Sequence, residues 1–359
     1  MLYYLILPPL LFEAALALRW RDLKRDLPPI LSLAVFGTVA AMAVVAVALI
    51  YLMNWPVASA LVFAALISAT DPVAIIAMFK DNGVHGRLRL LVEAESLLND
   101  AAAAVLFALA LAFALAGADG LTAAQMAWDL ARIVGGGALI GAGFGIAVIF
   151  AARGTSEHLV ELTLTAIAAY GSFLLAEHFH DSGVLAAVTA GLIIGNFRSV
   201  KKKGDFLTEK GREFLTDFWD FAAFVANSMV FLLIGARVAG SSYEHYPWTV
   251  YASVLAITLV ARAAAVYPLA AMFSRSRWRI TQGEQFVLWW GGLRGALALV
   301  LSLPSRVPLR DEIVLVTFFC VAFSIVVQGL TMPPVLRRLG FMGAPHEPSD
   351  PPEHEPAAR

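Results

Sequence analysis

The sequence predicts an all-α, polytopic membrane protein, and two observations support this fold class. First, 60% of the 359 residues are hydrophobic and 15% are charged, whereas soluble globular domains carry about 25% charged residues. Second, apolar runs close to the length of about 20 residues that crosses a bilayer as a helix recur along the whole chain. We therefore expect a lipid bilayer around most of the chain, and neither a soluble enzyme nor a nucleic-acid partner.

The apolar runs divide into about eleven predicted transmembrane spans. They cover residues 2–18, 29–53, 57–79, 88–116, 125–151, 159–178, 183–197, 218–236, 248–273, 283–303 and 312–336. Residues 1–340 thus form one predicted transmembrane domain. Residues 341–359 are rich in proline and charge, which predicts a disordered tail.

Lysine and arginine are concentrated in alternate loops, and this pattern predicts the orientation. The basic loops hold Arg19, Arg21, Lys24, Arg25, Lys80, Arg87, Arg89, Arg153, Arg198, Lys201, Lys202, Lys203, Lys210, Arg212, Arg275, Arg277, Arg279, Arg337 and Arg338. The loops between them hold only Arg237, Arg306 and Arg310. Because basic loops stay in the cytoplasm, we expect an inner-membrane protein with its N-terminus outside and its C-terminus, with the tail, inside.

A proline interrupts the third span in the sequence Thr70-Asp71-Pro72. Proline removes a backbone donor and disfavours the helical conformation of the preceding residue, so we expect the helix to break at Asp71. Freed backbone groups are tolerated inside a membrane where they are buried or line a cavity, and transporters use broken helices to hold ions. The alternative is a simple proline kink in which Thr70 and Asp71 satisfy loose backbone groups.

The fourth span carries acidic residues into a long apolar run. Glu93 and Glu95 precede Asp100, and residues 101–116 contain no ionisable side chain. A carboxylate at the centre of a membrane helix costs about 2.5–3.5 kcal/mol, so Asp100 is a candidate for binding an ion or a proton.

Helical spacing separates the polar residues of this span into two faces. Ser96 lies within about 60° of Asp100, whereas Glu95 lies about 140° away. We expect Ser96, Asn99 and Asp100 to line one cavity and Glu95 to face a different neighbour. Glu93 shares the face of Asp100 about two turns toward the cytoplasm, either in a wet funnel or as an interfacial charge.

Three further charged residues inside predicted spans are candidates for a structural or ion-binding role. Arg262 is alone near the middle of the ninth span, and a buried guanidinium requires a carboxylate, for which Glu95 is the natural candidate. Arg294 follows Gly291-Gly292-Leu293 in the tenth span, which predicts a second helix break; it either neutralises helix-end carbonyls or lies at a water-filled mouth. Glu13 is either a third cavity acid, which we favour, or a group near the cytoplasmic interface.

The two interrupted spans predict inverted repeats. Each is the second span of a three-span group, spans two to four and nine to eleven. An odd number of spans separates the groups, so they run in opposite directions through the membrane. Inverted repeats with crossing broken helices near the membrane midplane are typical of secondary transporters.

Five sequence strings together resemble the monovalent cation:proton antiporter-1 family, which includes NhaP-type sodium/proton antiporters and the animal sodium/proton exchangers. They are LPPLLFEAAL (7–16), SATDPVA (68–74), EAESLLNDA (93–101), LVARAAAV (259–266) and GGLRGALALVLSLP (291–304). The strings are spread from the first to the tenth span, so the resemblance covers almost the entire chain.

The resemblance implies roles for these residues. Asp100 would carry a cation and a proton alternately, with Thr70, Asp71 and Ser96 contributing to a Na⁺ site and Glu13 near the ion path. Glu95 and Arg262 would form a structural ion pair. The fold would be of the NhaA/NhaP type without its first two helices, which contribute to the dimer interface in relatives, so a homodimer remains an open expectation.

The sequence therefore predicts exchange of Na⁺ or Li⁺ for H⁺ by competition at Asp100, with alternating access and no cofactor beyond the transported ions. Asn99 adds no charge beside Asp100, which favours electroneutral exchange. The alternatives are K⁺/H⁺ exchange, which would use the same residues, and a truncated homologue that does not transport. An intramembrane aspartyl protease using Asp71 and Asp100 is disfavoured because its Gly-x-Gly-Asp signature is absent.

Overall fold

The computed structural model describes residues 2–116, 123–152, 157–197, 209–239, 247–294, 303–304 and 306–342, and within these ranges it contains helices and no strand. The predicted tail lies outside the described residues except for residues 341 and 342, and the basic stretch 198–203 also lies outside them. The all-α prediction is confirmed for the described part of the chain.

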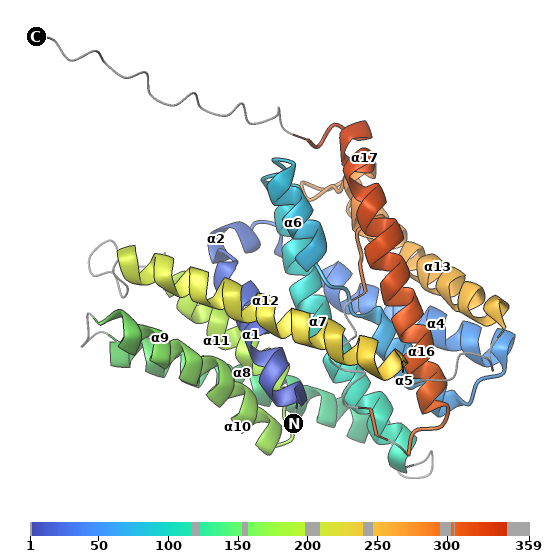
Figure 1. Ribbon diagram of the computed structural model, residues 1–359, viewed down its shortest axis with the longest axis horizontal. Coiled ribbons are helices and arrows are strands. Elements are labelled where there is room, and N and C mark those ends of the chain that lie inside the picture. The colour runs from blue at the N-terminus through green and yellow to red at the C-terminus, as the bar shows by residue number, and fades with distance from the viewer. Residues whose placement is uncertain are drawn as a thin grey trace, which may run out of the picture.

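One group of helices is made by the N-terminal helix and the middle of the chain. It comprises α1 (Leu2–Ala17), α8 (Ala123–Ala152), α9 (His158–Ala166), the π-helical turn η2 (Ile167–Gly171), α10 (Ser172–His178), α11 (Gly183–Asn196) and α12 (Glu209–Ala239). In this group α11 packs against both α8 and α1, and α1 also packs against α12. Figure 1 shows these helices side by side on the left of the molecule.

The second group combines residues 20–116 with the C-terminal helices. It comprises α2 (Trp20–Leu23), α3 (Leu27–Leu31), η1 (Ser32–Gly37), α4 (Thr38–Met53), α5 (Val57–Ser68), α6 (Val73–Asp81), α7 (Arg87–Ala116), α13 (Trp248–Met272), α14 (Gln282–Trp290), α16 (Arg310–Phe323), η5 (Ser324–Gly329) and α17 (Leu330–Arg338). Here α5 packs between α4 and α7, and α13 packs on α4, so segments distant in sequence share one core (Figure 1).

The helices have the length and apolarity that a bilayer requires, although not in every predicted span. Seven described helices are long and apolar enough to cross: Leu27–Met53, Arg87–Leu115, Ala127–Ala152, His158–His178, Glu213–Leu233, Trp248–Met272 and Arg310–Arg338. Three apolar helices are shorter: Tyr4–Ala17, Val57–Ser68 and Gly183–Asn196. The count of eleven spans is thus supported only in part, because helices such as α5 and α14 end at breaks inside their predicted spans.

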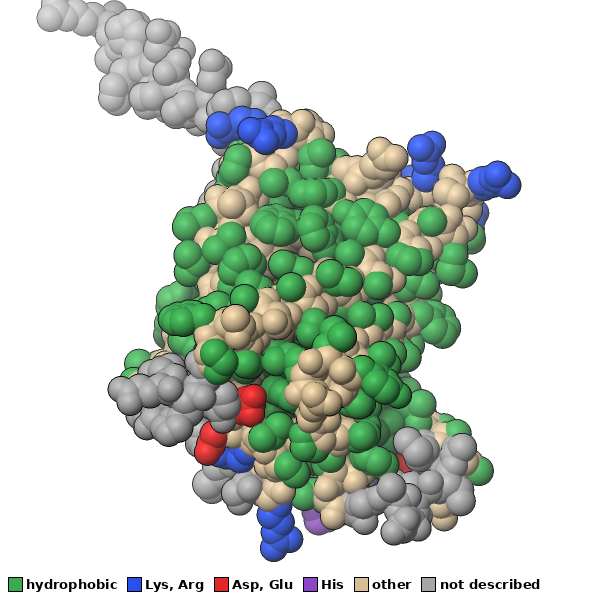
Figure 2. Space-filling view, turned by 90° about the vertical axis from the view of Figure 1, so that its right-hand side faces the viewer, with side chains coloured by type: hydrophobic (Ala, Val, Ile, Leu, Met, Phe, Trp, Pro, Cys, Tyr) green, Lys and Arg blue, Asp and Glu red, His purple; other side chains and the backbone are tan. Residues whose placement is uncertain are grey.

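The surface is apolar over a broad band. Figure 2 shows hydrophobic side chains across the middle of one face, with lysine and arginine side chains gathered at its upper and lower edges. Large apolar residues such as Tyr51, Phe224 and Leu330 are exposed. A contiguous apolar surface of this extent indicates an interaction with a membrane or a partner, and together with the long helices it supports a multi-pass membrane protein.

Candidate functional site at two helix breaks

The first break lies where the Thr-Asp-Pro sequence predicts it. Helix α5 ends at Ser68, Ala69 adopts an extended conformation, and α6 begins only at Val73, directly after Pro72. The predicted break is confirmed, and the alternative of a continuous, kinked helix is excluded. Thr70 is buried, whereas Asp71 and Pro72 are partly accessible.

The second break follows α14 at the glycine pair. Helix α14 ends at Trp290, and Gly291 to Arg294 continue as irregular chain. A Cβ atom on Gly292 would lie 2.8 Å from Nε of Arg262, so only glycine lets the chain approach this guanidinium so closely. The following residues 295–302 lie outside the described part of the chain.

The two breaks contact each other directly. The backbone N–H of Asp71 donates to the carbonyl of Leu293 at 2.7 Å. Thr70 and Arg294 form an isolated antiparallel bridge. A backbone donor of the first break is thus paired with a backbone acceptor of the second, and irregular chain inside a membrane requires such pairing.

Arg294 connects the second break to the end of the first broken helix. Its guanidinium donates to the carbonyl of Ile67 at 2.7 Å and to that of Thr258 in α13 at 2.9 Å. The last carbonyls of a helix have no intrahelical donor and carry the negative end of the helix dipole, so a cation there is stabilising. Of the two positions that the sequence left open for Arg294, the structure shows it at a helix-end carbonyl, that of Ile67, whereas Thr258 lies in the middle of α13.

Arg262 serves the second broken helix in the same way, but with a carboxylate partner. Its two terminal nitrogens bind the two Glu95 oxygens at 2.9 Å each, and its Nε and Nη2 donate to the carbonyl of Leu288 at 3.3 and 3.0 Å. Both side chains are buried. The ion pair expected between spans four and nine is thus present, with the bidentate geometry that makes such pairs strong.

Asp100 lies beside this crossing. Its carboxylate accepts a hydrogen bond from the backbone of Thr70 and has Asp71 and Glu95 as charged neighbours. The Ser96 hydroxyl donates to the carbonyl of Thr70 at 2.6 Å and lies 2.9 Å from the Thr70 hydroxyl. Asp71 and Asp100 remain partly accessible, while Thr70 and Ser96 are fully enclosed. Two carboxylates, two hydroxyls and a carbonyl therefore gather at one place, in a chain segment that the sequence puts inside a membrane.

The side chain of Asn99 does not point toward Asp100, as the sequence analysis expected, but toward Glu95. Its amide nitrogen donates to Glu95 at 3.2 Å, because Glu95 and Asn99 are four residues apart and four residues bring a helix back to the same side. One residue turns the helix by about 100°, which separates Asn99 from Asp100. No described group donates to the buried Oδ1 atom of Asn99.

Glu93 and Glu13, the two other acidic residues that the sequence predicts near the ion path, lie outside this cluster. Glu93 is partly accessible and accepts a hydrogen bond from Arg89 at 2.7 Å, one helical turn earlier in α7. Glu13 in α1 is also partly accessible, and it forms a side-chain hydrogen bond with Asp220 of α12. The sequence analysis missed Asp220, because nothing in the sequence relates α12 to α1. Within the described ranges, no three His, Cys, Asp or Glu side chains converge as a site for a more highly charged metal would require.

The sequence model of the family "Sodium/hydrogen exchanger, transmembrane" matches residues 1–338. The chain belongs to this family. Both breaks, the Asp100 neighbourhood and the Glu95–Arg262 pair fall within the matched residues.

Individual relatives of this exchanger-family chain are named as Na⁺/H⁺ antiporters. The chain is 37% identical to ApNhaP of Aphanothece halophytica over 342 residues, which is 94% of this chain and 64% of that protein. It is 34% identical to NhaP of Pseudomonas aeruginosa over 357 residues, 96% of this chain and 82% of the relative. The chain therefore spans less than two thirds of ApNhaP and most of NhaP.

A solved structure has the same fold. The sodium proton antiporter MjNhaP1 from Methanocaldococcus jannaschii superposes with a TM-score of 0.76, covering 93% of this chain and 84% of MjNhaP1. The sequence identity of 20% limits this comparison to the fold.

Proposed function

We propose that this chain exchanges Na⁺ or Li⁺ for H⁺ across a membrane, and that Asp100 binds the cation and the proton in turn. The observation that carries the proposal is the position of Asp100 at the crossing of two broken helices, bonded to the backbone of Thr70 and beside Asp71. Membership in the sodium/hydrogen exchanger family supports the same activity.

The cation site would combine side-chain and backbone oxygens around the first break. Asp100 and Asp71 would supply charge, Ser96 its hydroxyl, and Thr70 its hydroxyl or carbonyl. These groups suit a hard monovalent cation, which prefers oxygen ligands. Ser96 now donates to Thr70, so on cation binding its hydroxyl would turn and offer a lone pair.

The charge balance supports electroneutral exchange. Glu95 is bound at both oxygens by Arg262, and it would act as a structural brace rather than as an ion carrier. Asn99, the residue before Asp100, adds no charge. One exchanging carboxylate charge would then be neutralised by either one cation or one proton.

Access to the site would alternate by movement of the group that contains both breaks against the group of α1 and α8–α12. The division into two groups in Figure 1 supports this proposal. Glu93 would lie on the cytoplasmic approach and Glu13 near the ion path. We further propose that residues 1–340 form one exchanger domain of about eleven spans arranged in inverted repeats. This domain would lie in the inner membrane with its N-terminus outside, and the protein would assemble as a homodimer.

Reconstituted vesicles can test the assignment of Asp100. The wild type should move protons when a Na⁺ or Li⁺ gradient is applied, measured with a pH-sensitive dye. Asp100→Asn should reduce this signal to that of empty vesicles, whereas the matched control Asp311→Asn, at an exposed position, should keep it. Exchange retained in Asp100→Asn would refute the role of Asp100.

The same vesicles separate the cations. Equal activity with K⁺ would replace Na⁺ selectivity by general monovalent exchange. Activity with K⁺ alone would make the protein a K⁺/H⁺ exchanger. A wild type without any exchange would refute the proposed activity.

A further inference from the structure

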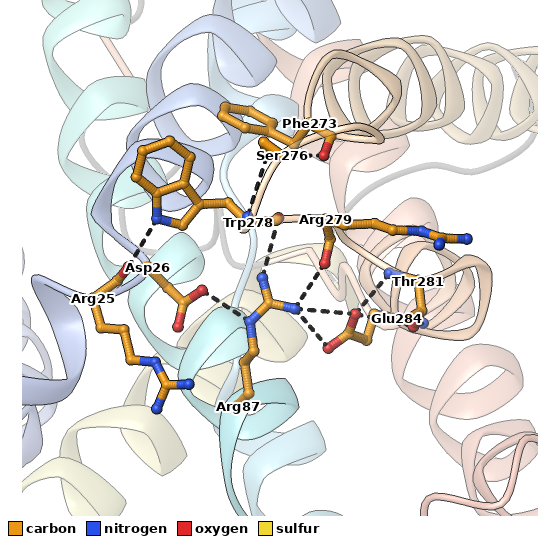
Figure 3. A network of polar contacts seen from close by, with 9 residues as sticks. All are labelled: Arg25, Asp26, Arg87, Phe273, Ser276, Trp278, Arg279, Thr281 and Glu284. Atoms are coloured by element: carbon orange, nitrogen blue, oxygen red, sulfur yellow. Dashed lines mark hydrogen bonds and ion pairs between the residues drawn. The ribbon is translucent and has the colours of Figure 1, made fainter.

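The N-terminal end of α7 is held by an arginine whose contacts join segments far apart in sequence. Figure 3 shows Arg87 between Asp26, which precedes α3, and Glu284 in the first turn of α14. Arg87 donates to Asp26 at 2.8 Å and to the two Glu284 oxygens at 3.2 and 3.3 Å. It also donates to the carbonyls of Arg279 at 3.0 Å and Trp278 at 3.2 Å. The planar guanidinium thus uses most of its donors on separate partners.

The two carboxylates are built into this arrangement. Asp26 stands at the N-cap position of α3 but makes no side-chain bond to its own helix; its carboxylate faces Arg87 instead. Glu284 completes a capping box with Thr281 at the start of α14 while it accepts from Arg87. Asp26 and Glu284 are both buried, at 5% and 6% exposure, so removing Arg87 would leave two enclosed charges.

The contacts of Arg87 differ in what they connect. Asp26 belongs to the segment that leads into α3, which itself packs on α7, so this contact lies within one three-span group. The Glu284 carboxylate and the carbonyls of Trp278 and Arg279 belong to the other three-span group, which includes α13, α14, α16 and α17 and contains the second break. Helix α14 packs mainly on α13 and α17, so Arg87 is the side chain that fastens the start of α14 to α7.

The opposite end of α14 is fastened to the same helix. Glu95 of α7 holds Arg262, and Arg262 holds the carbonyl of Leu288, close to the break at Gly291. Eight residues of helix, about 12 Å, separate Arg87 from Glu95 on α7. With both ends fixed, α14 keeps one position relative to α7, and α7 carries Ser96 and Asp100.

We propose that Arg87 is a positioning residue for ion exchange: by joining α7 to the start of α14, it holds the second break in register with the first and so sets the geometry of the cation site. Without this contact, α14 would be free to pivot about the Arg262 end. The pivot would move Leu293, which accepts from the Asp71 backbone, and would loosen the spacing of the oxygens around Asp100. The inference rests on the proposed sodium/proton exchange.

The test compares the half-saturating Na⁺ concentration with the maximal rate per amount of protein in reconstituted vesicles. Arg87→Lys keeps the charge but cannot reach all the partners of the guanidinium at once. We expect the half-saturating Na⁺ concentration to rise about fivefold or more, the lower end of typical coupling between separate sites. A residue that only supports folding would lower the maximal rate through fewer active carriers and leave the half-saturating concentration unchanged.

Matched variants separate the two kinds of contact. Glu284→Gln preserves the capping box and weakens the Arg87–Glu284 contact, which joins the two three-span groups. Asp26→Asn removes an equally buried charge from the Arg87–Asp26 contact, which lies within one three-span group. Glu284→Gln should raise the half-saturating concentration, and Asp26→Asn should change it less than about twofold, since it leaves the two groups joined. Arg132→Lys serves as a control, because Arg132 joins α8 to Phe179 and Asp181, away from both breaks.

The positioning role of Arg87 and the proposed Na⁺/H⁺ exchange would fail in different ways. An unchanged half-saturating concentration in Arg87→Lys, or equal effects of Glu284→Gln and Asp26→Asn, would overturn the positioning role while the wild type still exchanges ions. If Arg87→Lys does not insert in the membrane, the comparison of Glu284→Gln with Asp26→Asn still decides. A wild type without Na⁺-driven proton movement would refute the proposed exchange itself.

Discussion

The two helix breaks both leave helix-end carbonyls inside the protein, but they are built from different residues. The first break, from Ala69 to Pro72, is polar and contains a threonine, an aspartate and a proline. The second, from Gly291 to Arg294, has two glycines and a leucine before the arginine. In each, helix-end carbonyls lie inside the protein and require a donor, and in each an arginine from elsewhere provides it.

The two arginines differ in the partners that their guanidinium groups bind. Arg294 binds carbonyls and has no carboxylate partner among the contacts described. Arg262 binds its carbonyl while holding Glu95 with both terminal nitrogens. One arginine is therefore paired with a carboxylate, and the other is bound by backbone carbonyls.

The largest effect is expected at the second break. Arg262→Met leaves the buried Glu95 carboxylate without a counter-charge and should lower the free energy of unfolding by about 3–5 kcal/mol. Adding Glu95→Gln removes that charge and should recover part of the loss. Denaturant unfolding of the protein in detergent measures both, and equal destabilisation by the single and double variants would argue against an ion pair that stabilises this break.

A smaller effect is expected for the arginine that serves the first break. Arg294→Met leaves carbonyls without their donor but strands no charge, so the loss should be about 1–3 kcal/mol. The same unfolding measurement ranks it against Arg262→Met. A loss larger than that of Arg262→Met would overturn the distinction between the two arginines.

An effect of similar size to that of Arg294→Met, within a comparison that also includes the smallest change, is expected at Gly292. In Gly292→Ala, the added Cβ would lie 2.8 Å from Nε of Arg262 and would displace the guanidinium, at a cost of about 1–3 kcal/mol. Gly143→Ala in α8 is the control, because no atom lies within 4 Å of its added Cβ; there the change should stabilise the helix by about 0.5–1 kcal/mol. Equal responses at the two positions would show that the second break tolerates a side chain.

The sequence predicted the breaks because their causes are local. Proline disfavours a helical conformation in the residue before it wherever it occurs, so Asp71 could be located without any knowledge of its neighbours. The Glu95–Arg262 pair could also be predicted, because a lone arginine in an apolar span requires a carboxylate and the helical angle of Glu95 directs it away from Asp100.

Other features depended on contacts that the sequence does not record. Asn99 was assigned to the cation face, yet its amide lies against Glu95. Asp220 bonds to Glu13 across two helices that are distant in sequence. Arg87 counted only as one of several basic loop residues, although it lies between two buried carboxylates.

What the sequence by itself determined is therefore the composition of the membrane-spanning helices, the position of the first break, and the set of charged residues that a bilayer makes costly. These follow from the solvation of single residues and from backbone sterics, which act locally. The tertiary structure alone decided which arginine serves which helix end, that the breaks bond to each other through Asp71 and Leu293, and that Arg87 joins α7 to α14. Such pairings depend on distances between helices, and those distances are set only when the packed helices bring their freed backbone groups and buried charges together.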